Sequence, residues 1–98
     1  MIAIRWATQA ADDLVSIRDF IARDSIHYAR LVVQRIVTAT DLLASSPRMG
    51  CVVPELNDPE VREIIVGAYR IVYRYRHDLV EIATVFHSAR LFPSSSVA

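Results

Sequence analysis

The residues best suited to do chemistry lie in the last third of the chain, where arginines interrupt the apolar segment VREIIVGAYRIVYRYRHDLVEIATVFHSAR. A guanidinium group binds carboxylates and phosphates through paired hydrogen bonds, and a histidine gains or loses a proton near neutral pH. Burying such cations is unfavourable unless they are paired or bind an anion. We predict that Arg70, His87 and Arg90 lie together and bind a phosphate or a carboxylate.

Two tight turns place these residues on a sheet. Gly67 and Ala68 have the pattern of a type II′ hairpin, and His77 and Asp78 can form a second two-residue turn. The sequence therefore predicts three antiparallel strands. Because side chains alternate along a strand, one face of this sheet is apolar and should lie on the helices. Its residues are Ile64, Val66, Tyr69, Ile71, Tyr73, Tyr75, Val80, Ile82, Thr84 and Phe86.

The opposite face carries the charged side chains. Arg74 lies directly opposite Glu81 and close to Glu63, which predicts a cross-strand ion pair. Arg70 has no carboxylate directly across from it, and His87 lies farther along the same face. This difference makes Arg70, rather than Arg74, the candidate for binding an external anion.

Two further arginines lie near strand ends. Arg62 falls at the opening edge of the sheet, and Arg76 directly precedes the second turn. We expect both side chains to be solvated there, and Arg62 is a further candidate for contact with a target.

Two helices precede these strands. Apolar residues recur at spacings of three and four from about Ala10 to Ala22, after Thr8, which is a favourable N-cap residue. The same period continues from Ala29 to Leu43, after Asp24 and Ser25, which can cap a second and longer helix. Because the link between the helices is short, they should be antiparallel neighbours that form a helical hairpin.

The remaining segments complete the fold. Ile2–Trp6 is a short strand-like run, and PRMGCVVPELNDP contains three prolines and one glycine, which indicates an irregular connection along an edge of the sheet. We therefore predict an α+β fold with the element order β-α-α-β-β-β, in which the helical hairpin packs on one face of a small antiparallel sheet. Residues 1–92 should form a single domain and residues 93–98 a mobile tail.

Composition narrows the classes of function. The 98 residues are 53% hydrophobic, and eleven arginines with no lysine give a net charge of zero, unlike a protein that binds nucleic acid mainly through phosphates. Cys51 is the only cysteine, so neither an intramolecular disulfide nor a cysteine zinc site is expected, and nothing implies a cofactor. No signal-peptide pattern and no apolar run of membrane-spanning length is present, so we expect a cytoplasmic protein without a membrane partner.

The order of these segments resembles the RelE/ParE superfamily of toxins from bacterial type II toxin-antitoxin systems, which include plasmid-stabilisation systems. The resemblance covers about residues 4–91 and is carried by WATQAADDLVSIRDFIARDS, the connection P-x-x-G-x-x-V-P-E, the segment YRIVY and the closing V-x-H-x-x-R. It implies the same fold, a helical hairpin on one face of an antiparallel sheet. It also implies a cognate antitoxin whose flexible segment wraps the toxin in a hetero-oligomer.

Members of this superfamily differ in their function. Members that resemble RelE cleave messenger RNA at the ribosome without a metal ion, whereas members that resemble ParE inhibit DNA gyrase by binding and are not nucleases. For an RNase, the resemblance assigns catalytic roles to Arg70 as the sheet arginine and to Glu55 in VPEL as an acidic base. It would further assign a role to His87 or Arg90 as terminal-strand catalysts.

Three departures from the RNase pattern favour the ParE-like role. The tail LFPSSSVA lacks the tyrosine that many RNase members carry there, the chain has no lysine, and zero net charge suits ribosomal RNA poorly. We therefore predict a gyrase-inhibiting toxin that is not an enzyme. A ribosome-dependent mRNA endoribonuclease is the alternative, and a non-toxic member that only binds a partner is the third. The residues expected to contact the target are Arg70, His87, Arg90 and Arg62.

Overall fold

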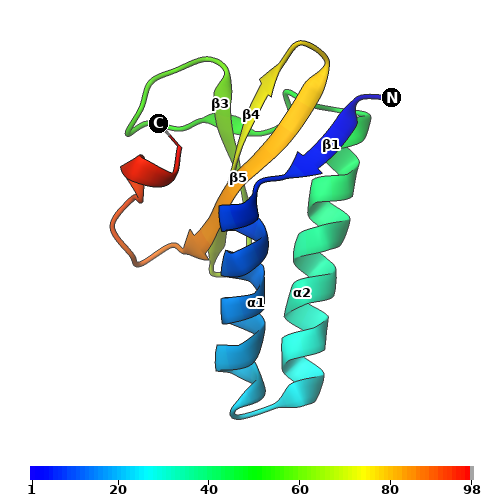
Figure 1. The fold of residues 1–98 in the computed structure, drawn as a ribbon, viewed down its shortest axis with the longest axis vertical. Helices are drawn as coiled ribbons and strands as arrows, with labels where there is room; N and C mark the ends of the chain where they lie inside the picture. The colour runs from blue at the N-terminus through cyan, green and yellow to red at the C-terminus, as the bar shows by residue number, and fades with distance from the viewer. Residues whose placement is uncertain (98) are drawn as a thin grey trace.

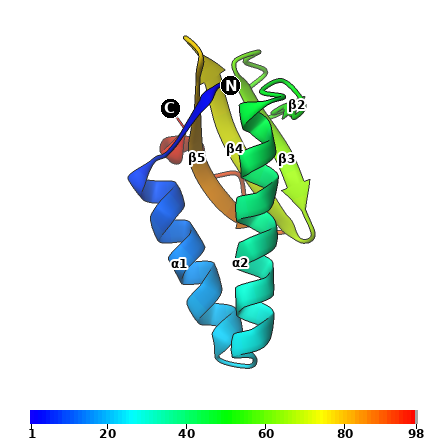
Figure 2. The same ribbon diagram turned by 90° about the vertical axis from the view of Figure 1, so that its right-hand side faces the viewer.

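A computed structural model describes residues 1–97, in which two helices pack side by side on one face of a five-stranded sheet (Figure 1, Figure 2). The elements, in chain order, are β1 (Ala3–Trp6), α1 (Thr8–Ala22), α2 (Ile26–Asp41), a 3-10 turn (Leu42–Ala44), β2 (Cys51–Val52), β3 (Val61–Val66), β4 (Tyr69–Arg76), β5 (Leu79–His87) and a second 3-10 turn (Ser94–Ser96). The predicted α+β order is confirmed, with one short strand, β2, added inside the segment predicted to be irregular.

The strands lie in the order β1-β5-β4-β3-β2 across the sheet. β1 runs parallel to β5, which differs from the predicted antiparallel sheet, whereas the other three pairs are antiparallel. A parallel pair needs a crossover connection, and the helical hairpin forms part of that crossover. β5 therefore lies inside the sheet between β1 and β4, and residues 82–86 of this strand are all buried.

The two helices differ in how they begin. Ser25 caps α2 as predicted, because its side chain accepts a hydrogen bond from the backbone N–H of Tyr28. Thr8, the expected cap of α1, is instead the first helical residue, and Ala7 takes the cap position without a side-chain hydrogen bond. Neither helix of the described chain has the length and the apolar run that a membrane crossing would require.

Both predicted two-residue turns are present. Gly67 has a φ of 56°, which a type II′ turn requires at its first position. His77 and Asp78 have φ values of 54° and 57°, and positive values at both positions define a type I′ turn. Next to this turn the register is as predicted, because Arg74 pairs with Glu81.

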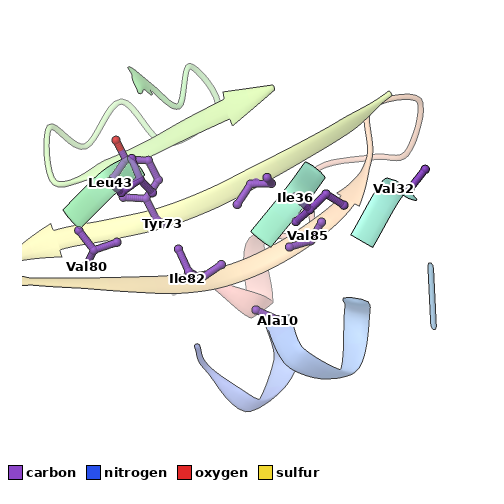
Figure 3. Close-up of a cluster of buried hydrophobic side chains, with 9 residues drawn as sticks. Ala10, Val32, Ile36, Leu43, Tyr73, Val80, Ile82 and Val85 are labelled. Carbon is purple, nitrogen blue, oxygen red and sulfur yellow. The ribbon is translucent and has the colours of Figure 1, made fainter. Parts of the chain in front are cut away.

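The larger core lies between the helical hairpin and the sheet (Figure 3). Its buried residues are Ala10, Val32, Ile36, Leu43, Ile71, Tyr73, Val80, Ile82 and Val85. Removing this apolar surface from water stabilises the fold by ~25 cal/mol per Å². The closed end of the hairpin projects beyond the sheet (Figure 1), which leaves Phe20, Ile26 and Tyr28 exposed.

A second and smaller core covers the other face of the sheet. Its buried residues are Val53, Val61, Val72, Ala83, Phe86 and Val97, and Leu56 and Phe92 pack against them. The sequence predicts a mobile tail over residues 93–98, and in the structure Val97 of this segment packs in the second core and is 6% exposed. Ala98, the last residue of the predicted tail, lies outside the described residues.

One extra residue in β5 changes the predicted register. Tyr73 pairs with Ile82, but the preceding Val72 pairs with Thr84, so Ala83 has no partner on β4. A bulge of this kind shifts the alternation of side chains by one position. The predicted alternation of side chains therefore holds only up to this bulge.

The bulge reverses the predicted faces at the end of β5. Val85 packs in the core beneath the helices, and Phe86 packs in the second core, although the sequence places Phe86 on the helix side. His87 lies opposite Tyr69, whose ring packs against the larger core, so His87 also lies on the helix side. The sequence places His87 on the other face, and the bulge is the reason for the difference.

Tyr73 holds the connection between α2 and β3 against the sheet. Its hydroxyl donates to the Pro47 carbonyl at 2.8 Å and accepts from the Gly50 N–H at 3.1 Å. Gly50 has no room for a side chain, because a Cβ there would lie 2.6 Å from the Glu63 carbonyl oxygen and 2.7 Å from the Tyr73 hydroxyl. Burial raises the pKa of Tyr73, so this hydroxyl stays neutral.

Candidate functional site

Arg70, the central candidate, is enclosed by two carboxylates and two aromatic rings. Its Nη1 and Nη2 each donate to one oxygen of Glu55 at 2.9 Å, and its Nε donates to Glu63 at 2.5 Å. The rings of Phe86 and Phe92 have centroids 5.2 and 5.3 Å from the guanidinium carbon. Only 13% of the Arg70 side chain is exposed. The expectation that Arg70 has no carboxylate partner is therefore wrong, and a role for Arg70 in binding an external anion stays a prediction.

These five residues form one unit, which we call the Arg70 cluster. Hydrogen bonding to Arg70 lowers the pKa of Glu55 from its ordinary value of 4.5 to about 2, and the same contact raises the pKa of Arg70. Glu55 is thus fully ionised at neutral pH. Two carboxylates surround a single guanidinium, so the Arg70 cluster has an excess of negative charge and repels other anions.

His87 and Arg90 lie in a groove between α1 and the end of β5, which shares Phe86 with the Arg70 cluster. The groove has a volume of about 490 Å³. Its lining residues are Asp13, Ser16, Ile17, Phe20, Tyr69, Val85, Phe86, His87 and Arg90. Arg70 does not line this groove. The structure therefore brings His87 and Arg90 together as predicted but separates both from Arg70, because the bulge turns His87 to the helix side.

His87 is oriented by two neighbours. Its Nδ1 accepts a hydrogen bond from the backbone N–H of Ala89 at 3.0 Å, which places the proton of the neutral imidazole on Nε2. The ring meets that of Tyr69 edge to face, with centroids 5.6 Å apart. His87 is exposed, and its Nε2 has no hydrogen-bond partner within residues 1–97. This N–H is therefore available to a partner that enters the groove.

The predicted ion pair of Arg74 is replaced by another. Arg74 lies in register with Glu81, but its Nη1 is 3.5 Å from a carboxylate oxygen of both Asp58 and Glu60. Glu81 instead pairs with Arg5 of β1 at 2.7 Å. The parallel strand β1, whose place in the sheet was not predicted, supplies the competing cation.

Arg62 is half-buried, in contrast to the solvated side chain that its position suggests. Its Nη1 donates to the Gly50 carbonyl at 2.9 Å, so the side chain lies along the connection that precedes β3. Arg76 is 55% exposed, as predicted. Neither residue lines the groove that holds His87.

Asp13 has a role that the sequence did not indicate. Its Oδ2 accepts from the Thr84 hydroxyl at 2.5 Å and from the Val85 N–H at 3.1 Å, and its Oδ1 accepts from Gln9 at 2.7 Å. β1 covers β5 only as far as Ile82, so Asp13 satisfies a backbone donor on the edge that β1 leaves open. The contact joins residues 72 positions apart, and no local pattern marks it.

The described residues offer few other groups suited to chemistry. No set of three or more His, Cys, Asp or Glu side chains within residues 1–97 is placed to hold a metal ion. Cys51 is exposed and has a free thiol. Within residues 1–97, the groups best suited to binding or catalysis are therefore the arginines and the carboxylates that pair with them.

Sequence comparisons relate most of the chain to known toxins. Residues 4–92 match the protein family described as the ParE toxin of type II toxin-antitoxin system, parDE. Toxin RelE2 of Caulobacter vibrioides is 36% identical over 92 residues, which cover 93% of this chain and 100% of the relative. Putative toxin Y4kP of Sinorhizobium fredii is 37% identical over 92 residues, which cover 92% of each chain.

Solved structures share the fold. A chain from the chromosomal ParDE TA system from P. aeruginosa superposes with a TM-score of 0.74 at 23% identity, over 89% of this chain and 96% of that chain. A chain from the toxin-antitoxin complex RelBE2 of Mycobacterium tuberculosis superposes with a TM-score of 0.63 at 23% identity, over 88% of this chain and 96% of that chain. These likenesses confirm the fold expected from the resemblance. The family match over residues 4–92 shows that this chain belongs to the ParE toxin family of type II toxin-antitoxin systems.

Proposed function

We propose that this toxin acts in the cytoplasm by binding and inhibiting DNA gyrase and has no active site of its own. The observation that supports this proposal is the closed pairing of Arg70 with Glu55. An RNase of the RelE type would need a free guanidinium for the scissile phosphate and a carboxylate able to accept a proton. In this chain the two groups that would serve these steps neutralise each other.

Arg70 is poorly placed to bind a phosphate. Its Nε, Nη1 and Nη2 all donate to carboxylates already, and the Phe86 and Phe92 rings pack against the guanidinium. A phosphate would have to displace Glu55 and approach Glu63 against the negative charge of the Arg70 cluster.

Glu55 and His87 do not complete a catalytic set. A general base works best when its pKa lies near the operating pH, so a pKa of about 2 makes Glu55 a weak base at neutral pH. His87 lies on the helix side of the sheet, whereas Phe86 of the Arg70 cluster packs on the other side. Arg70, Glu55 and His87 therefore do not converge on one bound phosphate.

A supercoiling assay with purified gyrase tests the proposal. We expect the toxin to inhibit ATP-dependent supercoiling and the cognate antitoxin to relieve that inhibition. Glu55→Gln should leave inhibition within about twofold of wild type, because this carboxylate has no chemical role. Undisturbed supercoiling at toxin concentrations well above that of gyrase would rule the proposal out.

One finding favours a second candidate function, ribosome-dependent cleavage of messenger RNA, because a relative at 36% identity is named Toxin RelE2. Primer extension on a reporter message after induced expression would reveal such cleavage. In that case Glu55→Gln and Arg70→Gln should both abolish the cuts. A chain that neither inhibits gyrase nor cleaves messages, at confirmed protein levels, would instead be a non-toxic partner-binding member.

We also propose that a cognate antitoxin silences this toxin by occupying the groove between α1 and β5. The two structural neighbours come from a ParDE system and a RelBE2 toxin-antitoxin complex. Ile17 and Phe20 in the groove suit the apolar face of an amphipathic helix, and Arg90 suits an acidic residue beside that face.

Isothermal titration with the antitoxin tests the groove. Phe20 is 67% exposed, so Phe20→Asp should keep the fold and weaken binding by about tenfold or more, since one large apolar contact is lost. Val15→Asp is the matched control, because Val15 lies on the same helix, is 46% exposed and does not line the groove. An equal loss of antitoxin affinity in both variants would contradict the assignment of the groove as the antitoxin site.

A further inference from the structure

Three arginines converge around the β4–β5 turn, away from the Arg70 cluster and the groove. They line a hollow of about 460 Å³, which we call the arginine hollow. Its lining includes Arg48, Arg62, Tyr75, Arg76, Glu60 and Asp78. The groove between α1 and β5 lies at the opposite end of β4, about 20 Å away at ~3.3 Å per strand residue. The two surfaces are therefore separate.

Two of these arginines are fixed by uncharged partners. The Arg48 guanidinium carbon lies 4.9 Å from the centre of the Tyr75 ring, and Arg62 donates to the Gly50 carbonyl at 2.9 Å. A ring face or a carbonyl oxygen holds a guanidinium in place without cancelling its charge. The hollow thus presents cations that are already oriented and lose little side-chain freedom when they bind.

The acids near the hollow leave it with an excess of positive charge. The lining holds three arginines and only two carboxylates, those of Glu60 and Asp78. Glu60 lies 3.9 Å from Arg76 and 3.5 Å from Arg74, and Asp58 also lies 3.5 Å from Arg74. Within residues 1–97, Arg48 and Arg62 form no ion pair. Arg76 is 55% exposed and can turn toward a partner. The hollow is therefore an attractive site for an anion.

The mixture of charges favours single carboxylates over a nucleic-acid backbone. A nucleic-acid strand carries a charge on every nucleotide and would bring some of them against Glu60 and Asp78. An acidic protein segment can place individual carboxylates opposite Arg48 and Arg76, where each planar guanidinium binds one through two hydrogen bonds. The zero net charge of the chain adds no general attraction for nucleic acid.

We propose that the arginine hollow is the surface that binds the protein target of this toxin, through carboxylate side chains of an acidic segment on that target. This inference rests on the proposed function, because it assigns the target surface of a toxin that acts by binding. The proposed antitoxin groove lies at the other end of the sheet, so binding of target and binding of antitoxin can be measured as separate properties.

Charge reversal tests the hollow directly. The hollow variant Arg48→Glu/Arg76→Glu reverses two exposed cations and spares Arg62, whose backbone contact supports the fold. The control variant Arg18→Glu/Arg30→Glu makes the same change in net charge at exposed positions of α1 and α2 outside the hollow. Any difference between the variants then reports the position of the charge rather than its amount.

The first measurement uses fluorescence anisotropy at low salt with two labelled probes, an octaglutamate peptide and an eight-nucleotide oligothymidylate. We expect wild type and the control variant to bind the peptide alike, and the hollow variant to bind it about tenfold more weakly, because two attractions become repulsions. Equal binding by the two variants would overturn the inference. Tighter binding of the oligothymidylate, lost in the hollow variant, would also overturn it by assigning the hollow to nucleic acid.

The second measurement separates this inference from the proposed function. The hollow variant should need about tenfold more protein than wild type for half-inhibition of gyrase, yet bind antitoxin as wild type does, which shows that it is folded. Unchanged inhibition, or loss of antitoxin binding with inhibition intact, would overturn the inference. If wild type leaves gyrase active, the proposed function fails, while the peptide titration still decides whether the hollow binds carboxylates.

Discussion

Replacing Glu55 with glutamine should remove much of the acid sensitivity of the Arg70 cluster while preserving its shape. Arg70 lowers the pKa of Glu55 from 4.5 to about 2. A carboxyl group whose pKa is lower in the folded protein stabilises the fold fully at pH values above its pKa in the unfolded state. This stabilisation is lost as the pH falls through its pKa in the folded state. The contribution of Glu55 is therefore complete above about pH 4.5 and disappears between that pH and about 2.

The magnitude follows from the two pKa values and the exposure of the side chain. A lowering from 4.5 to about 2 corresponds to roughly 3 kcal/mol at ~1.36 kcal/mol per pH unit. Because 39% of the Glu55 side chain is exposed, solvent screens its attraction to Arg70. We therefore expect the ionised pair to stabilise the fold by about 1 kcal/mol at neutral pH.

Urea unfolding followed by circular dichroism, at neutral pH and at about pH 2.5, measures this contribution. Wild type should lose about 1 kcal/mol more than Glu55→Gln between the two conditions. Asp19→Asn is the control, because Asp19 is 64% exposed and pairs only with Arg18 on the surface of α1 among the described residues. Parallel pH profiles for Glu55→Gln and wild type would refute the reasoning, since the pair would then contribute no free energy.

Three further substitutions test contacts that hold the fold. Gly50→Ala should lower the free energy of unfolding in urea by roughly 1–3 kcal/mol, because its Cβ would lie 2.6 Å from the Glu63 carbonyl oxygen. Tyr73→Phe should lower it by about 1–3 kcal/mol in the same assay, because two buried backbone groups lose their hydroxyl partner. Asp13→Ala should have an effect of similar size, about 1–3 kcal/mol, and should speed hydrogen exchange at the Val85 amide, which loses its acceptor.

Matched controls show whether these effects come from the named contacts. Gly67→Ala meets no atom within 4 Å and should destabilise only through its positive φ, by about 1 kcal/mol. Tyr75→Phe should have little effect on unfolding, because the Tyr75 hydroxyl makes no hydrogen bond within residues 1–97 and phenylalanine keeps the ring that packs against Arg48. Asp12→Ala, at an exposed position beside Asp13, should stay within about 0.5 kcal/mol of wild type. Controls that lose as much stability as their partners would mean that the contacts described here do not hold the fold.

The two helices, the three strands β3–β5 and the turns between them were predictable because their signals are local. Ser25 can cap a helix through its own side chain, and Gly67 tolerates the positive φ that its turn requires. Ala83 carries no such signal, because alanine neither breaks a strand nor needs an unusual backbone conformation. This single unmarked residue separates His87 from Arg70, which is why the predicted site divides into a groove and a cluster.

The ion-pair partners of the arginines could not be predicted for a different reason. Strand alternation predicts cross-strand neighbours, but Glu55 belongs to an irregular connection, and its contact with Arg70 depends on the path of that connection. The arginine hollow likewise joins Arg48, Arg62 and Arg76 from three separate segments. Positions near strand ends predict that arginines are solvated. Which of these arginines share one surface depends on the path of the connection between α2 and β3.

The extra residue in β5 also affects how the protein unfolds. Ile82 and Val85 pack beneath the helices, whereas Ala83 and Phe86 pack beneath the tail, so one strand belongs to both cores. The tail cannot detach without exposing Phe86, and β5 cannot shift without disturbing both sides of the sheet. We therefore expect the two faces to melt in one cooperative transition. Probes placed in the tail and in the helical hairpin should report the same Tm.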